Sequence, residues 1–75
     1  MSLPIQEAAM CRSIKTLRRV DLPATDEEID AAALQFVRKV SGFRTPSQKN
    51  AATFDLAVAE VAAASRRMLE ALGAR

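Results

Sequence analysis

Cys11 is the strongest nucleophile that this 75-residue sequence offers. Arg12 follows it directly, and Lys15 lies one turn further on if this segment is helical. Positive neighbours stabilise a thiolate, which would suit a reactive thiol in a redox role or a metal ligand. The alternative is a thiol that acts as a small apolar side chain. Because the sequence contains no histidine to serve as a general base, we do not expect an enzyme.

Two groups of basic residues could bind phosphates without reading a base sequence. The alternative is that they are solvated side chains, some of them placed to complement a helix dipole. The net charge of +2 is small for a nucleic-acid-binding protein, and there is no Tyr or Trp to stack on bases. The three Phe residues are expected mostly in the core. The candidate phosphate-binding residues of the first group are Arg12, Lys15, Arg18 and Arg19, and those of the second group, around the turn, are Arg38, Lys39, Arg44 and Lys49.

Carboxylates gather between positions 26 and 30, but their positions favour a role at a helix end over a metal site. Asp26, Glu27 and Glu28 fall in the first turn of a predicted helix, where negative charge complements the helix dipole. The sequence has no His, one Cys and two Gly residues, which excludes an intrachain disulfide and argues against a closed zinc site or a glycine-rich phosphate loop. We therefore expect no metal and no cofactor.

The best-specified element is a helix over residues 26–41. Thr25 and Glu28 form a capping box before it, and Gly42 is suited to end it in the left-handed conformation. The spacing predicts one apolar stripe, which leaves Leu34 and Val37 on a second surface. The stripe consists of Ile29, Ala32, Ala33, Phe36, Val40 and Phe43.

A second helix is predicted over residues 48–72, ended by Gly73. Thr45 and Gln48, with Pro46 between them, would form another capping box, with Ser47 or Asn50 as competing caps. In this helix Arg66 is expected on the polar side, paired with Glu70. An apolar seam with alternating spacings of four and three is predicted, with Ser65 bonding back one turn. The seam is Phe54, Val58, Val61, Ser65, Met68 and Leu72.

The short connection between these helices predicts an all-α fold, an antiparallel helical hairpin. Residues 10–20 form either a short amphipathic helix, which we favour slightly, or an extended arm, and they are expected to cover the surface of Leu34 and Val37. A hairpin this thin needs further cover, so we also expect a homodimer in the form of a four-helix bundle. The candidate partner surface is Ile14, Leu17, Leu34 and Val37.

Length and composition predict one small domain over residues 10–75, preceded by a flexible leader over residues 1–9. Met10 is an alternative start of translation. The first nine residues lack the features of a signal peptide, and no stretch has the length and apolarity of a transmembrane helix, so we expect a cytoplasmic protein with no membrane partner. A single cysteine is also typical of the reducing cytosol.

Several stretches follow the pattern of a known family. They are Met10–Leu17, Pro23–Thr25, Glu27–Ile29, Ala32–Phe43, Pro46, Ser47, Asn50, Phe54, Ala57, Val58, Glu60, Val61 and Arg66. On these residues the chain resembles, from Met10 to Leu72, a family of short and mostly bacterial proteins catalogued as domain of unknown function 2277. The resemblance implies that members begin at the position of Met10, from which residues 1–9 depart. It implies no activity, cofactor or partner.

Three functions follow from these observations as hypotheses. The leading one is a small cytoplasmic interaction module that associates with itself and with an unknown protein partner. The second is a nucleic-acid-associated protein that binds phosphates through its basic residues. The third is a thiol-based redox or metal role at Cys11.

Overall fold

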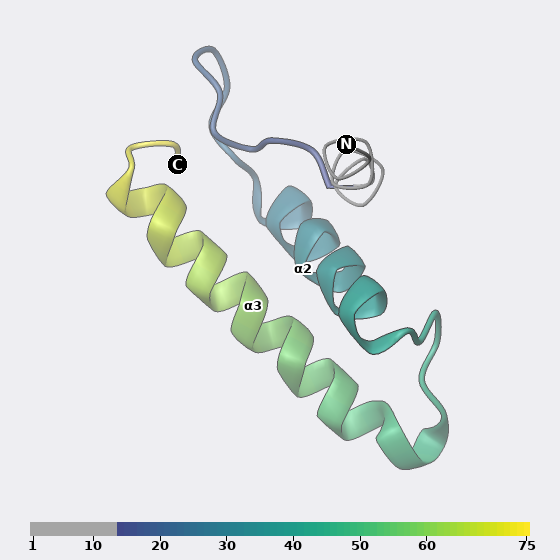
Figure 1. Cartoon of the computed structure of the whole chain (residues 1–75). Helices are drawn as coiled ribbons and strands as arrows, with labels where there is room; N and C mark the ends of the chain where they lie inside the picture. The colour runs from purple at the N-terminus through teal and green to yellow at the C-terminus, as the bar shows by residue number, and fades with distance from the viewer. Residues whose placement is uncertain (1–13) are drawn as a thin grey trace, which may run out of the picture.

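The computed structural model describes residues 14–75, which fold as two antiparallel helices preceded by an extended segment (Figure 1). Helix α2 spans Asp26–Ser41 and helix α3 spans Ala51–Ala71, with a short 3-10 turn, η1, over Gln48–Asn50. No strand occurs in the described residues. The predicted all-α hairpin is therefore confirmed, whereas the four-helix bundle stays a prediction.

Both predicted ends of α2 are present. The Thr25 hydroxyl accepts a hydrogen bond of 3.1 Å from the Glu28 backbone N–H, and the Glu28 carboxylate accepts one of 3.0 Å from the Thr25 N–H. Gly42 has a φ of 78° and donates its N–H to the Arg38 carbonyl. The helix therefore begins and ends where its local sequence predicts.

Helix α3 begins differently from the prediction. The capping box at Thr45 and Gln48 is wrong, because Gln48 lies in η1 and Asn50 takes the cap position without capping through its side chain. At the other end Gly73 has a φ of 74°. Its N–H bonds to the Glu70 carbonyl at 3.1 Å, and the Ala74 N–H bonds to the Leu69 carbonyl at 2.8 Å. This paired arrangement is a Schellman motif, which turns the chain sharply after α3.

The chain before α2 is the extended arm for residues 14–20 rather than the favoured helix, since none of them is helical. Leu17 is buried against the start of α2, in the same cluster as Ile29 and Ala33. The Ala24 N–H donates to the Ala74 carbonyl at 2.9 Å, which joins the base of the arm to the tail after α3. The arm thus closes the end of the hairpin remote from the turn.

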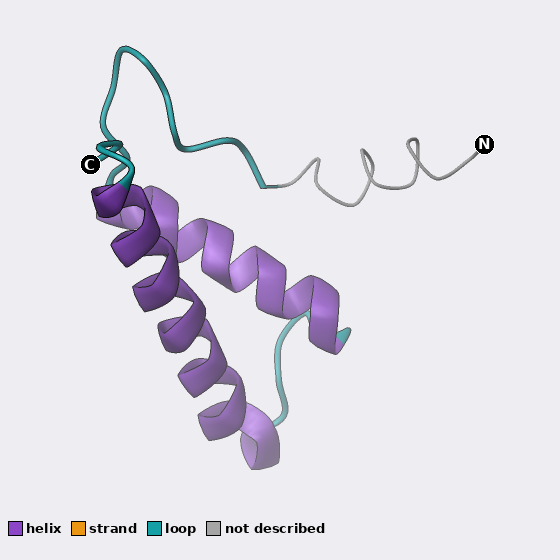
Figure 2. Ribbon diagram, turned by 60° about the vertical axis from the view of Figure 1, so that its left-hand side comes forward, coloured by secondary structure: helices purple, strands orange, loops and turns teal. Residues whose placement is uncertain are grey.

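The core is small and lies at that same end. Ile29 is the one large side chain of the described residues that is fully buried. Figure 2 shows the two helices close together near the end of α3 and spreading apart towards the turn. The buried cluster consists of Leu17, Ala24, Ile29, Ala33, Ala62, Leu69 and Ala74.

The predicted stripe on α2 is wrong in its second half. Phe36 is 46% exposed, Val40 is 64% exposed and Phe43 is 40% exposed, whereas Val37 is buried. The buried positions, Ile29 with Ala33 and Val37, are spaced by four. Rows spaced by four pack together when helices cross at an angle, while alternating spacings of four and three suit nearly parallel helices. The sequence pattern had favoured nearly parallel helices.

The seam on α3 is corrected in the same way. Met68 and Leu72 are more than half exposed, and Ala62 and Leu69 are buried instead. Phe54 is buried as predicted, and Ser65 donates its hydroxyl to the Val61 carbonyl one turn back, at 2.8 Å, as predicted. Contact between the helices therefore follows a line displaced from the one that residue spacing indicated.

Candidate functional site

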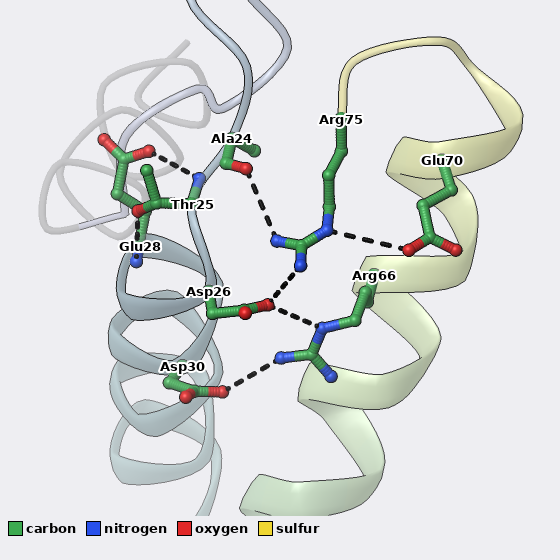
Figure 3. Close-up of polar contacts among 8 residues, drawn as sticks. All are labelled: Ala24, Thr25, Asp26, Glu28, Asp30, Arg66, Glu70 and Arg75. Carbon is green, nitrogen blue, oxygen red and sulfur yellow. Dashed lines mark hydrogen bonds and ion pairs between the residues drawn. The ribbon is translucent and has the colours of Figure 1, made fainter.

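One flank of the interface between α2 and α3 is closed by ion pairs (Figure 3). Arg66 of α3 contacts Asp26 at 3.1 Å and Asp30 at 3.4 Å, both on α2. Arg75 contacts Asp26 as well, and contacts Glu70 at 3.6 Å. The predicted pair between Arg66 and Glu70 is wrong, because Arg66 reaches across to the other helix. These ion pairs connect α3 and the tail to the start of α2 on this flank.

A second polar cluster attaches the arm to α2 through Glu28. The Glu28 carboxylate contacts Lys15 at 2.9 Å and accepts two hydrogen bonds from Arg19, at 2.8 and 2.9 Å. These bonds, together with the Thr25 N–H, hold the pKa of Glu28 well below its ordinary value, with Arg19 as the largest cause. The same bond raises the pKa of Arg19. A third hydrogen bond from Arg19, to the Pro23 carbonyl, fixes the bend of the arm.

The first predicted phosphate-binding group is therefore largely occupied within the chain. Lys15 and Arg19 are paired with Glu28, and among the described members of this group only Arg18 is exposed and forms no ion pair. Arg12 lies outside the described residues, and so does the predicted reactive thiol, Cys11. Within residues 14–75 no three His, Cys, Asp or Glu side chains come close enough to hold a metal ion.

The second predicted phosphate-binding group is brought together at the turn. Arg38, Lys39 and Arg44 line a hollow of about 250 Å³ along with Gln35, Gly42 and Phe43. The Arg38 Nε–H donates to the Arg44 carbonyl at 3.0 Å, which connects the end of α2 to the turn. Lys49, the fourth member, is exposed on η1 outside this hollow. Three of the four predicted residues thus share one site.

The predicted partner surface is not a single exposed surface. Leu17 and Val37 are buried, and Ile14 and Leu34 are half-buried. Nor does the arm cover Val37 as predicted, since Leu17 joins the cluster around Ile29, to which Val37 does not belong. Val37 instead lines a mainly apolar hollow of about 390 Å³ near the turn. The other residues that line this hollow are Ser41, Phe43, Asn50, Thr53, Phe54 and Ala57.

The exposed apolar side chains lie on the other flank of the helix interface from the ion pairs. At about 100° per residue, Phe36 and Asp30 fall on opposite flanks of the buried row of α2. On α3, Met68 and Arg66 fall on opposite flanks in the same way. We call this surface the open apolar face, defined by Phe36, Val40, Val61 and Met68; three are exposed and Val61 is half-buried. Sequence reasoning found these residues but placed them in the core.

Comparison with known proteins gives one match. The model of the family described as "Uncharacterized conserved protein (DUF2277)" matches residues 10–75. No curated protein and no solved structure matches the chain. Neither helix of the described region is long and apolar enough to cross a membrane.

Proposed function

The chain belongs to the DUF2277 family, and we propose that it acts as a small helical interaction module that pairs with a second copy of itself through the open apolar face. This surface flanks the buried row and extends into the half of α2 that the arm leaves uncovered. The arm covers the first half of α2 through Leu17, while Phe36 and Val40 in the second half are 46% and 64% exposed. That contrast is the observation on which the proposal rests.

A second copy is favoured as the partner by the composition of the face. Apolar side chains lie along both helices, and the small residues between them, Ala57 and Ala64, allow close approach. In a two-fold dimer α2 of one chain would lie on α3 of the other. The result would be the four-helix bundle that short chains with small cores commonly form. A cytoplasmic location stays part of this proposal.

Light scattering coupled to size-exclusion chromatography tests the proposal on the full chain. We expect twice the chain mass of 8.1 kDa at tens of micromolar. Val40→Lys introduces a charge on the open apolar face without burying it within the chain, so it should give a monomer that keeps its helical circular dichroism. Leu56→Lys is the matched control, because Leu56 is 60% exposed and points away from that face. A monomeric wild type at several hundred micromolar would refute the proposal, as would a dimeric Val40→Lys.

A further inference from the structure

The charges of this chain are distributed unevenly along its length. Residues 31–54 contain four of the eleven basic residues and none of the nine acidic ones, so this stretch carries a charge of +4. The rest of the chain carries seven basic and nine acidic residues, a charge of −2. We call the group Arg38, Lys39, Arg44 and Lys49, at the end of α2 and in the turn, the basic end.

The cations of the basic end have no ion-pair partner within the described residues, unlike four of the other described cations. Lys15 and Arg19 are paired with Glu28, and Arg66 and Arg75 are paired with carboxylates of α2 and α3. In the described part of the chain, no ion pair involves a residue of the basic end. Their charge is therefore available to an external anion, because no carboxylate of residues 14–75 pairs with it.

The hollow beside these residues carries positive charge on its lining. Three cations surround it, and the bond from Arg38 Nε to the Arg44 carbonyl orients one guanidinium while leaving its two terminal nitrogens available for further bonds. The C-terminal dipole of α2 opposes anions by about half a charge, which three cations outweigh. A guanidinium held in place binds phosphate oxygens at a smaller entropy cost than a freely rotating side chain.

An aromatic ring lies at the same hollow. Phe43 follows Gly42 in the turn, lines the hollow and is 40% exposed, contrary to the expectation that it belongs to the core. Proteins bind single-stranded nucleic acids with cations that contact the sugar–phosphate backbone and with aromatic rings that stack on the bases. A carboxylate-rich peptide would pair with the cations alone and would make no stacking contact with the ring.

We propose that the basic end binds single-stranded nucleic acid, with a phosphate group in the hollow between Arg38, Lys39 and Arg44 and a base stacked on Phe43. These contacts involve the phosphate and the face of the base but not the base edges, so binding is independent of nucleotide sequence. It also does not depend on pairing of two chains, because every residue involved comes from one copy.

Fluorescence anisotropy of a labelled 20-nucleotide strand of mixed sequence tests this proposal with the full-length protein. One phosphate in the hollow and a second in contact with Lys49 predict a salt slope of about −1.4 and therefore a loss of about sevenfold in affinity between 50 and 200 mM salt. Arg44→Gln should make the slope shallower by about 0.7. Phe43→Leu keeps an apolar side chain but removes the ring, and should weaken binding by roughly fivefold or more at constant slope.

The matched control is Arg67→Gln, which removes the same charge from an exposed arginine of α3 outside the basic end. This variant should bind within twofold of wild type. The proposal is overturned if no binding occurs at 50 mM salt or if Arg67→Gln weakens binding as much as Arg44→Gln. Equal competition by polyglutamate would identify an acidic protein as the partner, and preference for a labelled duplex would also overturn it. Light scattering on the Arg44→Gln variant shows separately whether self-association is intact.

Discussion

Replacing Ile29 with alanine tests whether the small core at the arm end holds this fold together. Ile29 has no exposed surface, and four of the seven residues in its cluster are alanines. Alanine side chains cannot change rotamer to fill a cavity, so we expect a loss of about 3–4 kcal/mol, within the upper part of the usual range. Domains of this size have a total stability of about 3–9 kcal/mol. One substitution should therefore remove at least a third of the free energy of unfolding.

Urea unfolding followed by far-ultraviolet circular dichroism measures this loss. With a denaturant slope of about 1 kcal/mol per molar urea, the midpoint should fall by about 3 M. Ile29→Val should cost only about 1 kcal/mol, because it removes a single methylene group. Leu56→Ala, on an exposed surface of α3, should change stability by less than about 0.5 kcal/mol. Measuring each variant at two protein concentrations separates folding from association. Equal losses for Ile29→Ala and Leu56→Ala would refute the assignment of the core.

Three further predictions concern polar contacts and chain geometry. Folding lowers the pKa of Glu28, so the ionised carboxylate stabilises the folded state. This contribution to the free energy of unfolding is complete above the ordinary carboxyl pKa of about 4 and disappears as the pH falls below that value. The thermal midpoint of Glu28→Gln should therefore depend less on acid than that of wild type, and equal dependence would contradict the contact with Arg19. Gly73→Ala should lower the free energy of unfolding, measured in urea, by about 1–2 kcal/mol. The loss comes from the positive φ alone, because no atom lies within 4 Å of an added Cβ. Unchanged stability would count against the Schellman motif. Arg66→Gln should cost up to about 1 kcal/mol at low salt and less at high salt, whereas Arg67→Gln should cost nothing measurable; a salt-independent loss would exclude the ion pairs with α2.

The features that were predictable from the sequence are those decided within a few residues. Thr25 and Glu28 are three positions apart, and Gly42 directly follows the helix that it ends, so local chemistry was enough to place both ends of α2. The same reasoning failed at Thr45, where the tight turn after Pro46 starts a 3-10 segment and delays α3 to Ala51. The rule for a capping box is local, but whether the chain can adopt it depends on the path of the turn.

The features that were not predictable depend on how the two helices cross. Residue spacing cannot distinguish a nearly parallel contact from a crossed one, because both present apolar residues every three or four positions. Val37 and Phe36 are neighbours in sequence, and only the crossing direction decides that the first is buried and the second exposed. The partner of Arg66 was missed for the same reason. Its carboxylates are 36 and 40 residues away, whereas Glu70 is four residues away.

The crossing of the helices also explains why the basic end and the α2 part of the open apolar face, Phe36 and Val40, lie towards the turn. At the end where the helices are close, Leu17 and Ala74 complete the apolar contacts and carboxylates pair with the arginines of the tail and arm. At the turn the helices have moved apart, the arm does not reach, and no carboxylate is encoded between residues 31 and 54. Phe36, Val40 and the cations of the basic end are therefore left without partners among residues 14–75, in the same half of the molecule. An internal role in stability does not account for a Phe and a Val that are exposed next to unpaired Arg and Lys residues, whereas contacts with other molecules do.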